Sequence, residues 1–417
     1  MDTQPSTHYH TPAVKQFNSA PPPGAAHVDL SEQAQFALAR QATGLEDFGA
    51  EDFLPAYRML QNSLETEACL NPYGRFKFQG STQRSLTNRL WANACFSAHP
   101  EIRQRKNAAP LIIIGHHRSG TTRLQRMLAL DPKLQHLRTW EIFNFAPRPG
   151  LPDHGQARRR EEVVQFLEMA KPIYPGAFVA HPMNADSPEE EMVLLNHSFS
   201  GFSPLMLYHI PSFYRWFLEN DKLTAYRYMT DAMKLISWSR DEPEDKRWLL
   251  KNPQHMLDLP TLMKVFPDAQ LIFIHRDPVK TSGSVLSLSW NFSVQHTDLP
   301  CRAHIRDTWM DFYEQMARRS IAAREHIPAA QQLDIHYADM NRDWRAEMRR
   351  VYEFAGMEFS AETENAMADW LAESEREGLH GGHRYALEDF GTTADEVDAR
   401  MKFYRDHYAI PYEKGSE

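Results

Sequence analysis

The stretch "GHHRSGTT", residues 115–122, has the glycine spacing of a phosphate-binding loop but lacks the lysine of such a loop. Thr121 and Thr122 stand where a nucleotide triphosphatase has Lys-Ser or Lys-Thr, and the positive charge lies inside the loop, at Arg118. A strand, such a loop and a helix together surround an anion with backbone N–H groups. The threonines would add hydroxyl donors, and Arg118 would add a charged fork.

The missing lysine makes ATP with magnesium a poor ligand for this loop. In P-loop enzymes that lysine reaches the β- and γ-phosphates, and here no clear acidic residue at a strand end offers itself to magnesium. Two alternatives stay open. The chain could be a nucleotide-dependent kinase whose charge has shifted to Arg118, or the motif could be a tight strand–helix turn with an exposed arginine.

Short runs rich in β-branched and apolar residues predict the strands that position such a loop. They are "PLIIIG" before it, and then "RWLLK", residues 271–274 and "QLDIHY". Helical patterns stand between them, and Pro278 suits the first turn of one helix, with Asp277 as its cap. This alternation predicts an α/β fold, with a P-loop-type parallel sheet flanked by helices on both faces.

Ligands of such sheets bind beyond the carboxyl ends of the strands. The loops at Gly115, Lys251, Arg276 and Tyr337 each follow a predicted strand. We therefore expect these four positions to converge on one crevice.

The pattern along the chain divides it into three parts. Residues 1–28 are polar and proline-rich, which predicts a disordered or extended tail. Apolar residues recur at helical spacing over residues 29–106, which predicts a helical N-terminal region. Residues 107–417 hold the predicted strands, and we expect them to form the α/β domain with a helical C-terminal part.

The composition, 42% hydrophobic and 24% charged, is typical of a soluble globular protein. A formal net charge of -9 argues against broad nucleic-acid binding, which usually shows a basic face. Cys69, Cys95 and Cys301 are widely spaced, so we expect neither a disulfide framework nor a cysteine metal site. Without a signal-peptide core or a run of about 18 apolar residues, we expect a cytoplasmic protein with no integral membrane segment.

Three motifs in order resemble those of the sulfotransferases that use 3'-phosphoadenosine 5'-phosphosulfate (PAPS). "LIIIGHHRSGTTRLQRMLALDP" is similar to their 5'-phosphosulfate loop, "FPDAQLIFIHRDPVKTSGSVLSL" to their 3'-phosphate motif, and "LDIHYADM" to the segment whose tyrosine reaches the adenine. The resemblance covers roughly Ala109 to the C-terminus and is closest to a bacterial-type branch of the P-loop sulfotransferases. It implies PAPS as the co-substrate.

The resemblance also implies the residues of the donor site. They are Arg118, Ser119, Gly120, Thr121, Thr122, Arg276, Ser284, Tyr337 and Arg384. Arg276 and Ser284 would hold the 3'-phosphate, and Arg384 lies in "HGGHRYALEDFG", the counterpart of a basic C-terminal stretch in many relatives. Because a sulfuryl group carries less negative charge than a terminal phosphoryl group, its transfer can proceed without a metal, and we expect none.

The acceptor hydroxyl must lose a proton as sulfur is attacked, so a base must lie within hydrogen-bond reach. Branches that act on protein tyrosine use a glutamate a little over twenty residues after the loop arginine, and Glu141 matches it. Many cytosolic relatives use a histidine in a lysine-initiated motif. In "LLKNPQHM" Pro253 occupies that place, which leaves His255 as the second choice. Lys251 would stabilise the bridging oxygen as the bond breaks.

Two nearby features have ordinary structural explanations. In "SPEEEMVLL", Ser187 and Glu190 predict a capping box at a helix start rather than a pair of catalytic acids. His181 and His197 are expected to be structural or pocket-lining residues, because no metal-ligand set surrounds them.

The acceptor is the least specified part of the prediction. The aromatic stretch "FSGFSPLMLYHIPSFYRWF" could line an apolar pocket or belong to an ordinary core. The pocket alternative predicts an apolar alcohol, phenol or lipid. The sequence thus favours sulfuryl transfer from PAPS to a hydroxyl of a small molecule or lipid, with no nucleic acid as partner and the oligomeric state undetermined. A nucleotide-dependent kinase and a non-catalytic protein that binds adenosine bisphosphate are the alternatives.

Overall fold

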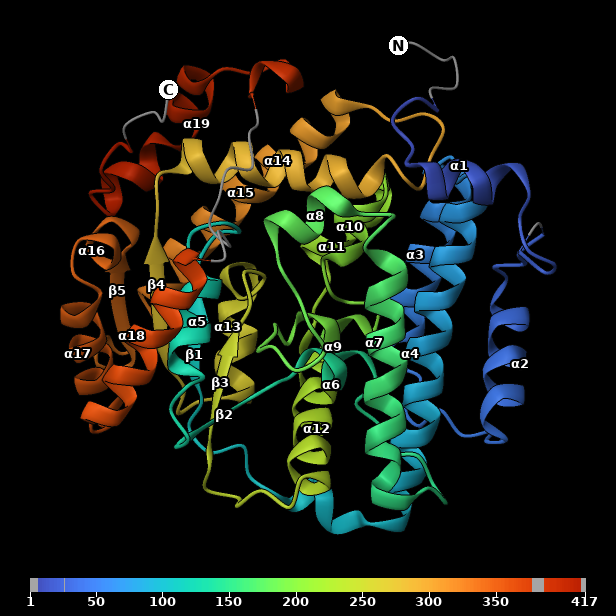
Figure 1. The fold of residues 1–417 in the computed structure, drawn as a ribbon, viewed down its shortest axis with the longest axis horizontal. Helices are drawn as coiled ribbons and strands as arrows, with labels where there is room; N and C mark the ends of the chain where they lie inside the picture. The colour runs from blue at the N-terminus through green and yellow to red at the C-terminus, as the bar shows by residue number, and fades with distance from the viewer. Residues whose placement is uncertain (1–6, 26, 377–385, 414–417) are drawn as a thin grey trace.

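The computed structural model describes residues 7–25, 27–376 and 386–413. It contains a five-stranded sheet of order β2-β3-β1-β4-β5, in which every neighbouring pair is parallel, and the sheet lies in the left part of the molecule as drawn in Figure 1. The strands are β1 (Leu111–Ile114), β2 (Leu134–His136), β3 (Arg247–Lys251), β4 (Gln270–His275) and β5 (Gln332–His336). The predicted α/β fold with a parallel sheet flanked by helices is confirmed.

Helices precede, connect and follow these strands. Before β1 come α1 (Pro12–Ser19), α2 (Glu32–Thr43), α3 (Leu54–Thr66), α4 (Pro72–Ala98) and η1 (Pro100–Gln104). Between β1 and β3 come α5 (Thr121–Leu128), α6 (Thr139–Phe143), η2 (Pro152–Gly155), α7 (Gln156–Ala170), α8 (Pro175–Ala180), α9 (Met192–Asn196), α10 (Ser203–Leu207), α11 (Pro211–Glu219) and α12 (Leu223–Ser239). After β3 come α13 (His255–Val265), α14 (Pro278–Ser293), α15 (Arg302–Arg324), η3 (Ala329–Gln331), α16 (Tyr337–Arg342), α17 (Trp344–Ala355), α18 (Ala361–Arg376), η4 (Glu388–Phe390) and α19 (Ala394–His407).

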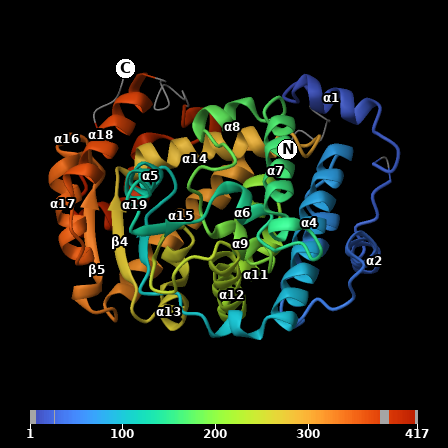
Figure 2. The same ribbon diagram turned by 60° about the horizontal axis from the view of Figure 1, so that its bottom comes forward.

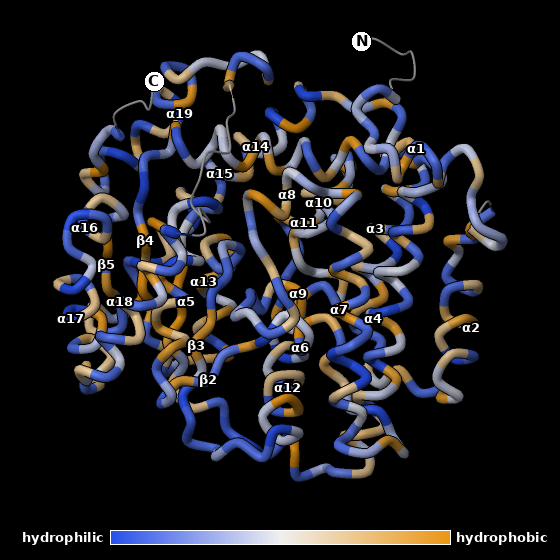
Figure 3. The backbone as a smooth tube through the Cα atoms, viewed as in Figure 1, coloured by the Kyte–Doolittle hydropathy of each residue, from blue (hydrophilic) through white to orange (hydrophobic). Residues whose placement is uncertain are grey.

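The two faces of the sheet bury alternate residues of each strand, because successive side chains of a strand point to opposite faces. In β1, Ile112 and Ile114 belong to a large core that continues into α3, α4 and α12–α15. Leu111 and Ile113 belong to a smaller core under α5, α17 and α18. Figure 3 shows β1 and β4 in the orange of hydrophobic residues, as expected for strands covered on both faces.

The N-terminal helices lie far from the edge strand β5. Figure 1 and Figure 2 agree in placing α2 and α4 at the opposite end of the molecule from β5. The predicted tail over residues 1–28 is wrong for α1, because Val14 is fully buried and the ring of Phe17 packs 5.5 Å from that of Tyr73 in α4. The first helix is therefore held by tertiary packing, which its own sequence does not reveal.

Most predicted elements near the loop are confirmed. The carboxylate of Asp277 caps α14 by accepting from Val279 N at 2.9 Å, with Pro278 in the first turn. The edge strand β2 was not predicted, because three residues are too few to show a pattern. Among the described residues, no helix is both long and apolar enough to cross a bilayer, and no cluster of three or more metal-ligating side chains occurs.

Candidate active site

The phosphate loop joins β1 to α5 and has two residues in the left-handed backbone region. Arg118 has a φ of 68° and Gly120 a φ of 97°. A Cβ atom at Gly120 would lie 2.6 Å from Cδ2 of Tyr337. Both the backbone angle and this close approach require glycine, so the loop and the tyrosine after β5 are fitted to each other.

Residues of the three motifs meet beyond the carboxyl ends of β1, β4 and β5. Arg118 Nε donates to Ser284 Oγ at 3.0 Å, and a terminal nitrogen of Arg276 donates to the carbonyl oxygen of Arg118 at 2.9 Å. The guanidinium of Arg276 also lies 4.0 Å from the ring centroid of Tyr337. Three segments far apart in sequence thus form one polar site, at the place where parallel sheets bind ligands.

Two further nitrogens of Arg276 bind a residue near the C-terminus. Its Nε and other terminal nitrogen donate to the two carboxylate oxygens of Glu413 at 2.8 and 3.0 Å. The neighbouring Asp277 instead pairs with Arg405 at 2.7 Å. Arg384 lies outside the described residues. The guanidinium of Arg276 is therefore held in place by a carboxylate that lies near the C-terminus of the chain.

Lys251 ends β3 and lies directly beside the loop. Its side chain is fully buried, its Nζ lies 3.4 Å from Thr122 Oγ1, and it forms an ion pair with Glu190. Its backbone N–H donates to Glu191 at 2.9 Å. The predicted meeting of Lys251 with the loop is present in the structure, and it brings in a glutamate from the acidic run before α9.

Two loop side chains have buried polar atoms without a protein partner in the described chain. They are the hydroxyl of Ser119 and both ring nitrogens of His117. Burial, followed by the nearby His116, Lys251 and Arg118, lowers the pKa of His117 well below its usual value. The imidazole is therefore neutral near pH 7 and offers one donor and one acceptor. Because buried polar groups are usually satisfied, these atoms indicate a ligand at the loop.

Glu141, the first predicted base, begins α6 but does not line a cavity with the loop. Its side chain is 1% exposed and forms an ion pair with Arg240, whose Nε lies 2.6 Å from Oε1. Its Oε2 also accepts from the backbone N–H of Arg138 at 2.9 Å. In this arrangement Glu141 joins α6 to α12 and closes its own helix terminus, so its carboxylate has no open side for an acceptor.

His255, the second predicted base, is equally enclosed at the start of α13. Its Nε2 lies 2.7 Å from Glu191 Oε1 and its Nδ1 lies 2.8 Å from the hydroxyl of Tyr226. The side chain is fully buried. Both ring nitrogens are satisfied within the protein. His255 and Glu191 form a buried pair, and Glu191 also accepts from the backbone N–H of Lys251 at the end of β3.

A cavity of about 320 Å³ opens onto the phosphate loop. From the loop side it is lined by His117, Arg118, Thr121 and Thr122, and beside them lies Glu190. The rest of the wall is mostly apolar and comes from α6, α7, α8, α10 and α14. Four residues within the aromatic stretch of the sequence line it as well: Phe202, Ser203, Met206 and Leu207. This is the apolar space beside an anion site that the pocket alternative predicts.

Glu190 was missed as a site residue because its run predicted a helix cap. The capping box of Ser187 and Glu190 is wrong: Ser187 Oγ donates to the carbonyl oxygen of Asn184 at 2.8 Å, and α9 begins only at Met192. The acidic residues instead lie in an irregular segment against the cavity. Only the ion pair with Lys251, which is distant in sequence, shows what Glu190 contacts.

The neighbouring Glu189 is committed to another partner in the same wall. Its carboxylate lies 3.1 Å from His181 Nε2, and its backbone carbonyl accepts from Gln125. Burial alone would raise the pKa of Glu189, but His181 and Lys251 outweigh it and lower the pKa to about 2. Glu189 is therefore ionised at neutral pH. His181 lines the cavity as expected, whereas His197 is buried and bonds the carbonyl of Ile142.

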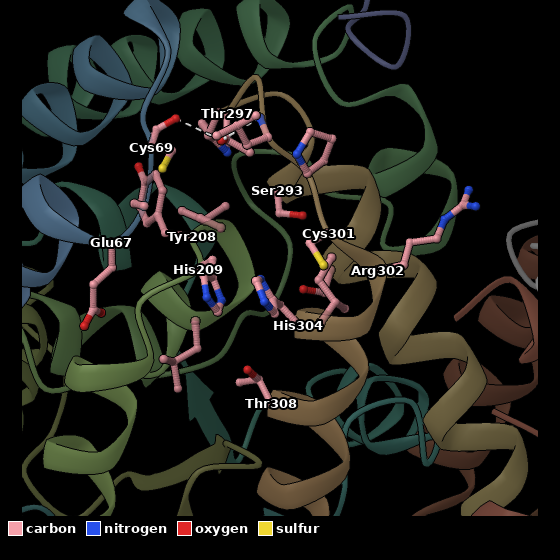
Figure 4. A pocket seen from close by; sticks show the side chains of 18 of the residues that line it. Glu67, Cys69, Tyr208, His209, Ser293, Thr297, Cys301, Arg302, His304 and Thr308 are labelled. Atoms are coloured by element: carbon pink, nitrogen blue, oxygen red, sulfur yellow. Dashed lines mark hydrogen bonds between the residues drawn. The ribbon is translucent and has the colours of Figure 1, made fainter. Parts of the chain in front are cut away.

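A second cavity, of about 500 Å³, lies beside α10 and the start of α15. Figure 4 shows His209 and His304 facing each other in it, and their rings stack at 3.9 Å with an interplanar angle of 10°. Cys69 and Cys301 line the same space. No residue of the phosphate loop lines this cavity, so the polar site and the 320 Å³ cavity together are the candidate active site.

Comparison with known proteins places this geometry in a family. A sequence model described as the sulfotransferase family matches residues 110–361. The crystal structure of the sulfotransferase STF1 from Mycobacterium tuberculosis is similar, with a TM-score of 0.76 and 28% identity over 90% of this chain and 99% of that chain. The sulfotransferase STF9 from Mycobacterium avium gives a TM-score of 0.79 and 26% identity over 93% of this chain and 99% of that one.

A curated relative adds a named substrate. The omega-hydroxy-beta-dihydromenaquinone-9 sulfotransferase Stf3 of Mycobacterium bovis is 24% identical over 254 residues. The matched region covers 60% of this chain and 63% of the length of that relative.

Proposed function

Because the chain belongs to the sulfotransferase family, we propose that it transfers a sulfuryl group from PAPS to a hydroxyl of an apolar small molecule or lipid. One observation carries this proposal: the apolar cavity of about 320 Å³ ends at Arg118, Thr121 and Thr122 of the phosphate loop. An acceptor in that cavity would meet a donor held by the loop. The relative that acts on an omega-hydroxy menaquinone supports a lipid-like acceptor.

The residues around the loop suit a phosphosulfate and a second phosphate. The N–H groups at the start of α5, the orphan hydroxyl of Ser119 and the threonine hydroxyls would hold the 5'-phosphosulfate. Arg276 and Ser284 would bind the 3'-phosphate, with Tyr337 beside the adenine. We further propose that Arg384 joins this site. Charged hydrogen bonds of this kind are about twice as strong as neutral ones.

The proposed step forms one bond and breaks one. The acceptor oxygen attacks sulfur, and the bond between sulfur and the 5'-phosphate oxygen breaks, so that adenosine 3',5'-bisphosphate leaves with the electron pair. Lys251 and Arg118 would stabilise the negative charge that develops on that oxygen, and their position at the loop supports this role. Preorganised donors at such a position lower a barrier by a few kcal/mol each. Since the sulfuryl group carries little charge, we propose no metal for this step.

Glu190 is the group that we propose as the base, in place of Glu141 and His255. It lines the acceptor cavity next to Thr122, whereas Glu141 is bound by Arg240 and His255 by Glu191 and Tyr226. A base must lie within hydrogen-bond reach of the hydroxyl that it deprotonates. The neutral ring of His117 in the same wall can orient that hydroxyl by accepting or donating a hydrogen bond.

A transfer assay with radiolabelled PAPS and a library of hydroxylated acceptors tests this function. We expect label in apolar alcohols, phenols or lipids, and the same turnover when a chelator removes divalent metal. Calorimetry separates the alternatives. Binding of adenosine 3',5'-bisphosphate without magnesium supports the proposal, and magnesium-dependent ATP binding supports a kinase. Bisphosphate binding with no labelled product from any acceptor supports a non-catalytic binding protein.

A further inference from the structure

The acceptor cavity has a second charged region, on the side away from the loop. Lys77, Ser81 and Arg84 of α4 line it. Their spacing of i, i+4 and i+7 places them on one face of that helix. Figures 1 and 2 both show α4 and α5 on opposite sides of α8. The cavity therefore runs from an anion site at the loop to a pair of cations on α4.

These two cations contact aromatic rings but form no ion pair in the described part of the chain, and Arg84 also lies 5.0 Å from the ring centroid of Phe143 in α6. Lys77 Nζ and the guanidinium carbon of Arg84 each lie 4.4 Å from the ring centroid of Phe166 in α7. Within residues 7–25, 27–376 and 386–413, neither forms an ion pair. Glu162, the carboxylate that contributes to the electrostatics of Arg84, already binds Arg148 at 2.7 Å and Arg158 at 3.2 Å.

An aromatic ring does not neutralise two cations. The attraction of a cation to one ring offsets a small part of the cost of removing the charge from water, and here two cations share a ring and repel each other. Burial lowers the pKa of Lys77 to about 7 and that of Arg84 to about 10. An anion between the two side chains would remove this penalty.

We propose that the natural acceptor is an amphiphile with a hydroxyl at one end, an apolar body and an anionic group, a carboxylate or phosphate, at the other end, which Lys77 and Arg84 bind. This inference rests on the sulfuryl transfer proposed above, and it narrows the acceptor class. The apolar wall contributed by α7, α8 and α14 would hold the body of the molecule. The planar fork of Arg84 suits either anion, and Lys77 adds a point charge.

The experiment is a calorimetric comparison of three ligands of equal chain length. They are an ω-hydroxy fatty acid, its methyl ester and the corresponding ω-hydroxyalkyl phosphate, each titrated into the full chain saturated with adenosine 3',5'-bisphosphate. We expect one or both anions to bind wild type about ten-fold to one hundred-fold more tightly than the ester, as a charged contact allows. The anion that binds more tightly identifies the group.

The variant Lys77→Met with Arg84→Met should abolish that preference and leave the affinity for the ester unchanged. The single variant Lys77→Met should remove part of it. Lys171→Met is the matched control, because Lys171 is an exposed residue paired with Glu168 and lies outside the cavity wall. It makes the same charge change as Lys77→Met, at the end of α7, and it should keep the preference.

The inference is overturned if neither anion binds wild type more tightly than the ester, or if the double variant keeps the preference. These failures are distinct from failure of the proposed function. If the protein binds the bisphosphate and sulfates neutral alcohols as well as acids, the proposed function stands and the anionic acceptor group is refuted. If the protein does not bind the bisphosphate, the proposed sulfuryl transfer itself is refuted.

Discussion

The two ends of the acceptor cavity treat charge in opposite ways. At the loop end, Lys251 is paired with Glu190, Glu189 with His181, and Arg276 with Glu413. At the α4 end, Lys77 and Arg84 both lie over the ring of Phe166, Arg84 also lies near that of Phe143, and neither forms an ion pair among the described residues. Paired charges hold each other in position before a ligand arrives, whereas unpaired charges that are partly buried, as Lys77 and Arg84 are, cost free energy and are stabilised most by a ligand of opposite charge.

This difference separates two roles. In our proposal the loop end places donors accurately around the reacting group, which is the condition for electrostatic catalysis. In our proposal the α4 end selects the acceptor that enters the cavity.

Glu190→Gln tests the loop end most severely. Glutamine keeps the size of the side chain but cannot take the proton, so we expect kcat to fall by about 10² to 10⁴. Calorimetry should show bisphosphate affinity close to wild type. A variant that keeps most of its kcat would show that the proton goes elsewhere.

Glu141→Gln should lower stability and leave kcat nearly unchanged, the opposite of what we expect for Glu190→Gln. It removes one charge of a buried ion pair and leaves Arg240 without its partner, which typically costs about 3–5 kcal/mol of unfolding free energy. Chemical denaturation would measure that loss, while kcat per folded molecule should stay near wild type. A large loss of kcat with unchanged stability would restore Glu141 as the base.

Arg276→Ala should weaken the donor site without altering the acceptor end. Loss of a charged contact to the 3'-phosphate should weaken the binding free energy of adenosine 3',5'-bisphosphate by about 1.5–3 kcal/mol, which raises its Kd roughly ten-fold to one hundred-fold. Calorimetry gives the value directly. Unchanged affinity would remove Arg276 from the 3'-phosphate site.

Lys77 gives the α4 end a pH dependence. Burial lowers the pKa of Lys77 to about 7, with a further contribution from Arg84 on the same helix, so its charge is present below that pH and is lost above it. The fatty-acid carboxylate stays ionised throughout. We therefore expect kcat/KM for the acid, divided by that for its methyl ester, to fall about ten-fold as pH rises from about 6 to about 9.

Dividing by the ester value removes the titration of the base from this profile. Burial, with a further contribution from the charge of Lys77, lowers the pKa of His296 to about 3. His296 therefore stays neutral over the pH range of the measurement. The ratio for Lys77→Met should be flat. A falling ratio in that variant would assign the titration to another group.

Glu413→Gln should give the smallest effect, with the opposite sign. The Glu413 carboxylate occupies two donors of Arg276, and the pair is about one quarter exposed on each side. Removing the competing charge should tighten bisphosphate binding by about five-fold, the worth of a partly exposed ion pair. Weaker binding in this variant would mean that Glu413 orients Arg276 rather than competing for it.

The sequence predicts best the parts that local pattern determines. The β1 strand, the cap of α14 by Asp277 and the approach of Arg118, Arg276 and Tyr337 follow from short motifs and from the geometry of parallel sheets. Each of these features depends on a few neighbouring residues, so one chain is enough to predict it.

The parts that escape prediction depend on distant partners. Glu190 appears in the sequence as a helix cap, and only its contact with Lys251, in β3, places it at the site. Glu141 has a suitable distance from Arg118 along the chain, but Arg240 from α12 encloses it. Lys77 and Arg84 lie in the helical N-terminal region that the sequence predicts, but no local pattern shows that α7 brings Phe166 over them. Such pairings are set by packing, which leaves no local signal.

The most direct test of the whole account is the fate of labelled sulfur in a reaction without divalent metal. Wild-type protein, PAPS carrying radiolabelled sulfur, an ω-hydroxy fatty acid and a chelator would be incubated together, with Glu190→Gln in parallel. We expect label in the fatty acid as a sulfate ester and one adenosine 3',5'-bisphosphate for each ester formed. The rate of the variant should be about 10²-fold to 10⁴-fold lower than that of wild type. No labelled ester from the wild-type protein, or equal rates for both proteins, would contradict it.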